Sequence, residues 1–79
     1  MAIVYSKSAA KVIERLDTVI KQRIKQGIEA IPQGDIKPLR GSEGSFRLRI
    51  GNWRILFSYE GEDVKIKKIA PRGGVYKGV

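Results

Sequence analysis

Hydrophobic residues in the first half of the chain follow a helical repeat. After a short run of β-forming residues at positions 2–5, apolar side chains recur every three or four residues, which is the spacing of one helix face. These apolar positions are Ala9, Val12, Ile13, Leu16, Ile20, Ile24, Ile28 and Ile31. The pattern predicts a strand followed by helical structure, and Ser6 or Ser8 can cap the helix start.

The helical stripe is too long for one helix in so small a protein. A helix over residues 9–31 would be about 34 Å long, whereas a compact domain of this size is roughly 30 Å across. Asp17 offers a second N-cap within the stripe, and a proline and a glycine after residue 31 end it. We therefore expect helices over residues 7–16 and 18–31, folded back as a hairpin. Gly27 is unfavourable inside the second helix by about 1 kcal/mol relative to Ala.

The second half of the chain changes to a period of two. Residues 45–50 alternate between polar and apolar side chains, Gly51-Asn52 is a two-residue turn signal, and residues 53–59 form another run of β-formers. This pattern predicts a β-hairpin, followed by a third strand over residues 64–69. The alternation falls out of phase at Lys68, which indicates either a bulge or the end of the strand.

These elements predict an α+β fold in which an N-terminal strand and a two-helix hairpin pack on an antiparallel β-sheet meander. A chain of 79 residues has room for one small core, since it buries only about 60% of the surface that it exposes when unfolded. We therefore expect a single domain over residues 1–79.

A hairpin closed by the two-residue turn has a definite register, and this register places its arginines on the face away from the core. Leu48 faces Ile55 on the core side, whereas Arg49 lies directly opposite Arg54 on the other side, with Arg47 one step along. Opposed like charges destabilise a hairpin, and an anion bound between them would remove the penalty. The alternative is that the guanidinium groups extend into water or pair with acidic residues, namely Glu43, Glu60 or Glu62.

Composition narrows the chemistry further. Sixteen Lys and Arg against eight Asp and Glu give a net charge of +8, which favours nucleic acid, an acidic protein or an anionic membrane surface as partner. The chain has no His and no Cys, which excludes the usual zinc sites, disulfides, thiol nucleophiles and imidazole bases. We therefore expect no metal and no cofactor. With no membrane span or secretory signal recognisable, we expect a cytoplasmic protein without a membrane partner.

Basic residues continue beyond the hairpin. Lys65 and Lys67 extend the basic face onto the third strand, although lysine on an outer strand also prevents edge-to-edge aggregation. Arg72 and Tyr76 follow, separated by two glycines that allow the segment to fold back over the sheet edge. The alternative for Tyr76 is a terminal aromatic ring that covers the rim of the core.

Five short motifs occur in order along the chain. They are Leu39-Arg40-Gly41, Phe46-Arg47-Leu48-Arg49, Trp53-Arg54-Ile55, Ala70-Pro71-Arg72 and Val75-Tyr76. With the two-helix front half, this ordered set resembles the RelE/ParE toxin superfamily, and its RelE branch more than the ParE branch. RelE-like toxins are mRNA interferases that cut mRNA in the ribosomal A site. The resemblance implies a toxin of a type II toxin–antitoxin system, with mRNA, the ribosome and a cognate acidic antitoxin as partners.

The same resemblance implies a catalytic group of Arg54, Arg72 and Tyr76. The 2′-hydroxyl of RNA can itself attack the phosphate, so metal-free cleavage needs only a base, a charge clamp and geometry. Arg54 and Arg72 would hold the scissile phosphate, and Tyr76 is the candidate base because arginine keeps its proton. The residues expected to position RNA are Arg47, Arg49, Lys65 and Lys67. Several relatives have lysine where Arg47 and Arg49 stand, so the proton donor is left unassigned.

Two other functions are compatible with the sequence. One is a ParE-like toxin that poisons DNA gyrase by binding, without nuclease activity; it would leave mRNA intact and would not require Tyr76. The other is a non-enzymatic nucleic-acid-binding module, which charge alone supports and whose overexpression would be harmless.

Overall fold

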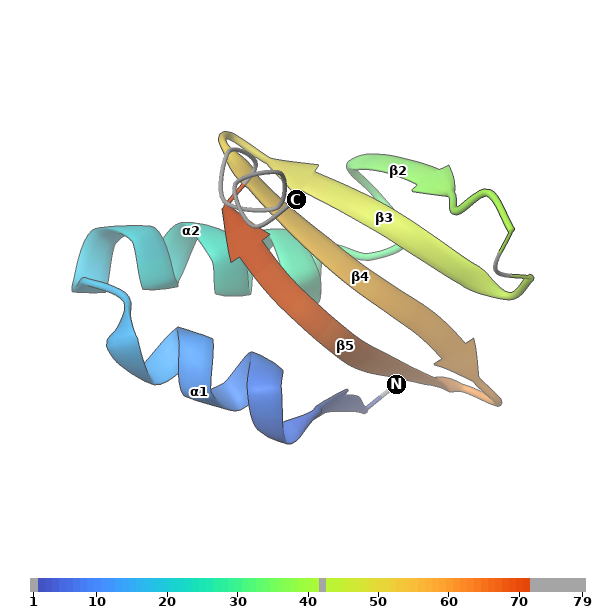
Figure 1. Ribbon diagram of the computed structural model, residues 1–79, viewed down its shortest axis with the longest axis horizontal. Coiled ribbons are helices and arrows are strands. Elements are labelled where there is room, and N and C mark those ends of the chain that lie inside the picture. The colour runs from blue at the N-terminus through green and yellow to red at the C-terminus, as the bar shows by residue number, and fades with distance from the viewer. Residues whose placement is uncertain (1, 42, 72–79) are drawn as a thin grey trace.

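The computed structural model of the chain describes residues 2–41 and 43–71, in which two helices cover one face of a five-stranded sheet (Figure 1). The helices are α1 (Lys7–Arg15) and α2 (Thr18–Glu29). The strands are β1 (Ile3–Tyr5), β2 (Asp35–Pro38), β3 (Ser45–Ile50), β4 (Trp53–Glu60) and β5 (Asp63–Pro71), in the sheet order β1-β5-β4-β3-β2. The predicted α+β class is confirmed.

Both helices begin at the predicted caps. The Ala9 N–H donates to Ser6 Oγ at 3.1 Å, and the Ile20 N–H donates to Asp17 Oδ1 at 3.0 Å, so each cap satisfies a backbone donor of the first turn. The helices end one and two residues earlier than predicted, at Arg15 and Glu29. The break between them is the predicted one, and the two-helix hairpin is confirmed.

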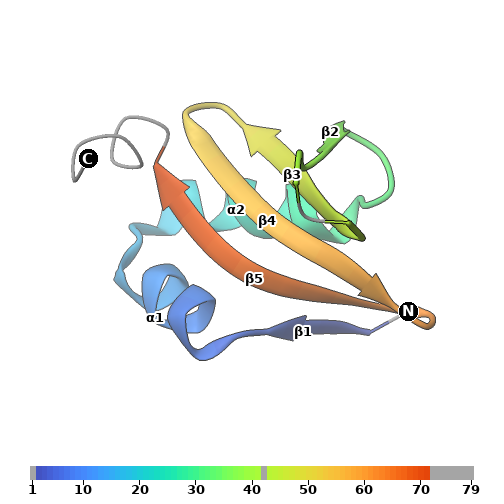
Figure 2. The same cartoon turned by 45° about the vertical axis from the view of Figure 1, so that its right-hand side comes forward.

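The sheet is more extensive than the predicted meander. Strands β3, β4 and β5 form the expected antiparallel meander, but β2 adds a fourth antiparallel strand beside β3, and β1 pairs in parallel with β5 (Figure 2). Strand β2 escaped prediction because its four residues, Asp-Ile-Lys-Pro, contain only one large apolar side chain, the half-buried Ile36. The sheet is therefore mixed.

Strand β5 contains the bulge that the sequence offered as one alternative. Leu56 pairs with Lys68 and the next residue, Phe57, pairs with Ile66, so Lys67 is an extra residue on β5. The strand continues past this point, and Ile69 returns to the core with an exposed fraction of 3%. The bulge thereby turns Lys68 to the face of the sheet opposite the helices.

The core lies between the helices and the sheet. Helix α1 packs on β5, and α2 packs on β3. The buried apolar side chains are Ala9, Ile24, Ile28, Ile31, Leu48, Ile55, Phe57, Val64, Ile66 and Ile69. Gly27 lies where α2 meets β3, and a Cβ built there would overlap the Ile50 side chain. Close packing therefore accounts for this glycine inside a helix. No helix of the described residues is long and apolar enough to span a bilayer.

Candidate nucleic-acid interface

The face of the sheet opposite the helices carries the hairpin arginines, and we call it the arginine face. Arg49 pairs directly with Arg54 across β3 and β4, and Arg47 lies two residues before Arg49 on the same face. Strand β2 places Lys37 beside Arg47 and Asp35 beside Arg49. The predicted register is confirmed, and it brings three of the predicted site residues together on adjacent strands.

Arg47 forms an ion pair on this face with a carboxylate of β2. Its Nη2 lies 3.7 Å from Asp35 Oδ1, with side-chain exposures of 17% for Arg47 and 48% for Asp35. No partner for Arg47 was predicted from the sequence, because the carboxylate that pairs with it comes from the unpredicted strand β2. A pair with so exposed a carboxylate contributes only about 0–1 kcal/mol to the stability of the fold.

The predicted lysines of β5 occupy different places. Lys67 Nζ donates to the buried Ser45 Oγ at 3.0 Å, so this side chain reaches from β5 over β4 to β3. Lys65 pairs with Ser58, which lies four residues along β4 from Arg54, or about 13 Å at ~3.3 Å per residue. Lys67 therefore lies across the arginine face, whereas Lys65 lies at its far end.

A basic residue that sequence reasoning did not assign to the site lies close to Arg54. Lys68 and Arg54 line the same small hollow of about 100 Å³, which we call the Lys68 hollow. Its other lining residues are Leu39, Leu56 and Ala70. The out-of-phase step in the sequence at Lys68 was the only sign of this arrangement, and alternation by itself could not tell which way the side chain turns.

Arg72 and Tyr76 lie outside the described residues, so their catalytic roles stay predictions. Strand β5 ends beside Arg54, because Ala70 pairs with Arg54 and Pro71, the last residue of β5, pairs with Trp53. Residue 72 therefore follows directly after the part of β5 that borders Arg54.

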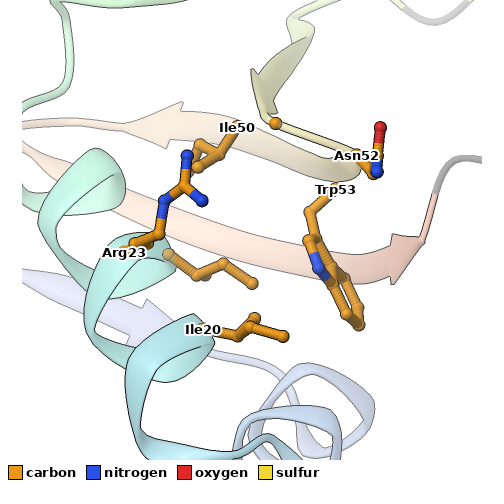
Figure 3. Close-up of a pocket in the computed structure, with 7 residues that line it drawn as sticks. Ile20, Arg23, Ile50, Asn52 and Trp53 are labelled. Atoms are coloured by element: carbon orange, nitrogen blue, oxygen red, sulfur yellow. The ribbon is translucent and has the colours of Figure 1, made fainter.

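A second hollow lies on the helical side of the sheet, between α2 and the β3–β4 turn, with a volume of about 160 Å³ (Figure 3). It is lined by Ile20, Arg23, Ile24, Ile50, Gly51, Asn52 and Trp53. Ile20 and Trp53 face each other across it. Among the described residues that line this hollow, Arg23 is the one ionisable side chain, so they offer no acid–base pair. Within residues 2–41 and 43–71, no group of three or more acidic side chains is placed to hold a metal ion.

The family is decided by a match over most of the chain. The family model described as "ParE toxin of type II toxin-antitoxin system, parDE" matches residues 3–76. The chain belongs to this toxin family. The toxin RelE3 from Methanocaldococcus jannaschii is 26% identical to it over 84 residues, covering 96% of each chain. The predicted membership of the RelE/ParE superfamily is thus confirmed, and the protein is a RelE-like toxin of a type II toxin–antitoxin system rather than a general nucleic-acid-binding module.

Solved structures share the toxin's fold. A chain of the RelB-RelE antitoxin-toxin complex from Methanococcus jannaschii matches with a TM-score of 0.78 and 24% identity, covering 95% of the toxin and 96% of that chain. A chain of the RelBE2 complex from Mycobacterium tuberculosis matches with a TM-score of 0.74 and 24% identity, covering 90% of both. The intact RelBE complex from E. coli gives 0.70 at 15% identity, covering 89% and 94%. At these identities the likeness concerns the fold.

Proposed function

We propose that this toxin is a ribosome-dependent endoribonuclease that cleaves mRNA in the ribosomal A site by attack of the RNA 2′-hydroxyl. The observation that carries the proposal is the direct pairing of Arg49 with Arg54 on the arginine face. Directly opposed residues of an antiparallel pair have Cβ atoms only about 4.5–5.5 Å apart, so both guanidinium groups can contact one phosphate. Such a clamp stabilises the negative charge that grows on the phosphate during cleavage.

The remaining roles follow the chemistry of the side chains. Arg72 completes the clamp on the scissile phosphate, and Tyr76 accepts the 2′-hydroxyl proton, because arginine does not give up its own proton at any working pH. Arg47 positions the RNA backbone, and Arg49 does so in addition to its electrostatic contribution beside Arg54. Lys67 and Lys65 extend the positive surface across β5. This reaction uses no metal and no cofactor, since RNA contributes the attacking oxygen.

The direct test is primer extension on an mRNA after induction of the toxin. Wild-type toxin should produce discrete breaks within codons, and Tyr76→Phe and Arg72→Ala should lose them. Lys25→Ala is the matched control, because Lys25 is exposed on α2, away from the arginine face. Intact mRNA with wild-type toxin would contradict the proposal, and undiminished cleavage by the Tyr76 and Arg72 variants would contradict their assigned roles.

An acidic antitoxin is the proposed protein partner. Relatives of this fold were crystallised as antitoxin–toxin complexes, and the net charge of +8 suits a negatively charged segment. We expect that segment to cover part of the arginine face or to displace the segment that follows β5. Co-purification at moderate and high salt tests the electrostatic contribution. A complex in which the antitoxin touches only the helices, leaving Arg54 accessible, would contradict direct covering.

Poisoning of DNA gyrase is the second candidate, because the matching family carries the ParE name. A gyrase poison would inhibit supercoiling by purified gyrase, induce DNA damage signals and leave mRNA intact. Its activity would also be insensitive to Tyr76→Phe. The supercoiling assay and primer extension together separate the two toxin functions.

A further inference from the structure

We propose that Lys68 is the catalytic residue that protonates the leaving 5′-oxygen when this toxin cleaves RNA. The inference rests on the nuclease function proposed above. It assigns the proton donor, a role that the arginines of the β3–β4 hairpin do not fill. The functional side chains of β3 and β4 on the arginine face are guanidinium groups, which keep their protons at any working pH. A lysine ammonium can give up a proton and take it back, and a compact ammonium also fits beside a single oxygen atom.

The bulge in β5 places Lys68 next to the phosphate clamp. Lys68 pairs with Leu56, and Arg54 pairs with Ala70, so Lys68 and Arg54 are diagonal neighbours on adjacent strands. Diagonal neighbours are about 7–8 Å apart, within reach of two long side chains that converge on one phosphodiester. Without the extra residue at Lys67, strict alternation would turn Lys68 toward the core and Ile69 outward, whereas Ile69 is in fact 3% exposed.

The surroundings of Lys68 fit a proton donor to a nucleotide. The Lys68 hollow is apolar apart from its two cations, Lys68 and Arg54, with Leu39, Leu56 and Ala70 as the rest of its lining. Among the residues that the structure describes, no carboxylate lines the hollow to hold the ammonium away from a bound phosphate. Lys68 is exposed to solvent, so it can recover a proton from water after each turnover.

The other lysines near the arginine face are placed less favourably. Lys67 Nζ is hydrogen-bonded to Ser45 Oγ at 3.0 Å, and Lys65 lies in the row of Ser58 at the far end of the face. Lys37 belongs to β2 and pairs with Arg47, on the opposite side of β3 from Arg54. Among the lysines within residues 2–41 and 43–71, Lys68 is the one that shares a hollow with Arg54.

The assigned step balances. The RNA 2′-oxygen forms a bond to phosphorus while its proton passes to the base, assigned above to Tyr76. The bond between phosphorus and the 5′-oxygen breaks, and its electron pair stays on that oxygen. Lys68 Nζ donates a proton to the 5′-oxygen, which leaves a 2′,3′-cyclic phosphate, a 5′-hydroxyl and a neutral amine that water reprotonates.

The experiment compares two RNAs that differ by one atom. Ribosomes are loaded with an mRNA whose cleaved linkage, mapped by primer extension, has either its natural 5′-oxygen or a sulfur in that position. A thiolate leaves without protonation, so it bypasses the proton donor. Lys68→Ala should slow single-turnover cleavage of the oxygen RNA by about 10²–10⁴-fold and should cleave the sulfur RNA at close to the wild-type rate.

Matched variants separate proton donation from charge. Lys68→Arg keeps the positive charge and should remain as slow as Lys68→Ala on the oxygen RNA, whereas Arg54→Ala should be slow on both RNAs because it removes stabilisation of phosphate charge. Circular dichroism checks that each variant is folded. The assignment is overturned if Lys68→Ala cleaves the oxygen RNA normally, or if it is equally slow on both RNAs. Wild-type toxin that cleaves neither RNA overturns the nuclease function and the Lys68 assignment together.

Discussion

Arg49 lies directly opposite Arg54 in the antiparallel pair of β3 and β4, on the face of the sheet opposite the buried Leu48 and Ile55. Two like charges in this position destabilise a hairpin by about 0.2–1 kcal/mol. The neighbouring carboxylate of Asp35 forms its ion pair with Arg47, 3.7 Å away. The arrangement gives up some stability and concentrates positive charge where a phosphate can bind.

Replacing one of the opposed arginines should stabilise the fold and weaken function. We expect Arg49→Gln to raise the free energy of unfolding by about 0.2–1 kcal/mol, with a larger gain at low salt because screening is weaker there. The same variant should cleave mRNA more slowly. Urea unfolding at two salt concentrations measures the first effect, with Lys25→Gln on α2 as control. If Arg49→Gln gives no gain in the free energy of unfolding, or a gain that is not larger at low salt, the two arginines do not repel each other as expected.

Removing the carboxylate beside Arg47 should strengthen RNA binding. Asp35→Asn breaks the ion pair and raises the net charge from +8 by one unit, while the free energy of unfolding falls by less than about 1 kcal/mol. We expect tighter binding of a labelled RNA oligonucleotide and a steeper salt dependence, measured by fluorescence anisotropy. Glu14→Gln makes the same charge change on α1 and is the matched control. Equal gains in RNA affinity from both variants would mean that net charge, rather than the arginine face, determines binding.

Gly27 should be intolerant of a side chain despite its position in a helix. Helix propensity alone favours Gly27→Ala by about 1 kcal/mol, but the added Cβ would overlap Ile50. We expect a net loss of about 1–3 kcal/mol, typical of overpacking. Ile50→Val removes one of the overlapping atoms, so a double-mutant cycle by urea unfolding should show that the two changes together cost less than their sum. Additive effects would contradict the close contact.

Ionisation of the Tyr5 phenol should make the free energy of unfolding depend on pH in the alkaline range. Burial, and secondarily the Glu29 carboxylate, raise the pKa of the Tyr5 phenol above its usual value of 10.0. Because the folded pKa is the higher one, this contribution to stability is complete below about pH 10 and is lost as pH rises through the folded pKa.

A comparison of wild type with Tyr5→Phe isolates this contribution. The difference in the free energy of unfolding between the two proteins should shrink or reverse as pH rises above about 10, as measured by urea unfolding. Glu29→Gln should weaken the pH dependence without abolishing it, because burial is the larger cause. An identical pH dependence in wild type and Tyr5→Phe would show that the phenol is not linked to folding.

Local sequence patterns were sufficient to predict the parts of the site that lie on one hairpin. A helical stripe interrupted at Asp17 predicted the two helices, and a two-residue turn at residues 51–52 set the register that places Arg49 opposite Arg54. These features could be predicted because turn length and side-chain alternation together leave one pairing that buries the apolar face.

The tertiary structure decided everything that depends on contacts between distant segments. Strand β2 has too few apolar residues to show a period, so Asp35 could not be assigned to Arg47 from the sequence. The packing of α2 on β3 explains Gly27, and the pairing of β5 with β4 determines which side of the sheet Lys68 occupies. By itself the sequence determined the helices, the hairpin and its opposed arginines, because those depend on neighbouring residues. Only folding brought Lys68 beside Arg54, because one extra residue in a strand reverses the face of those that follow.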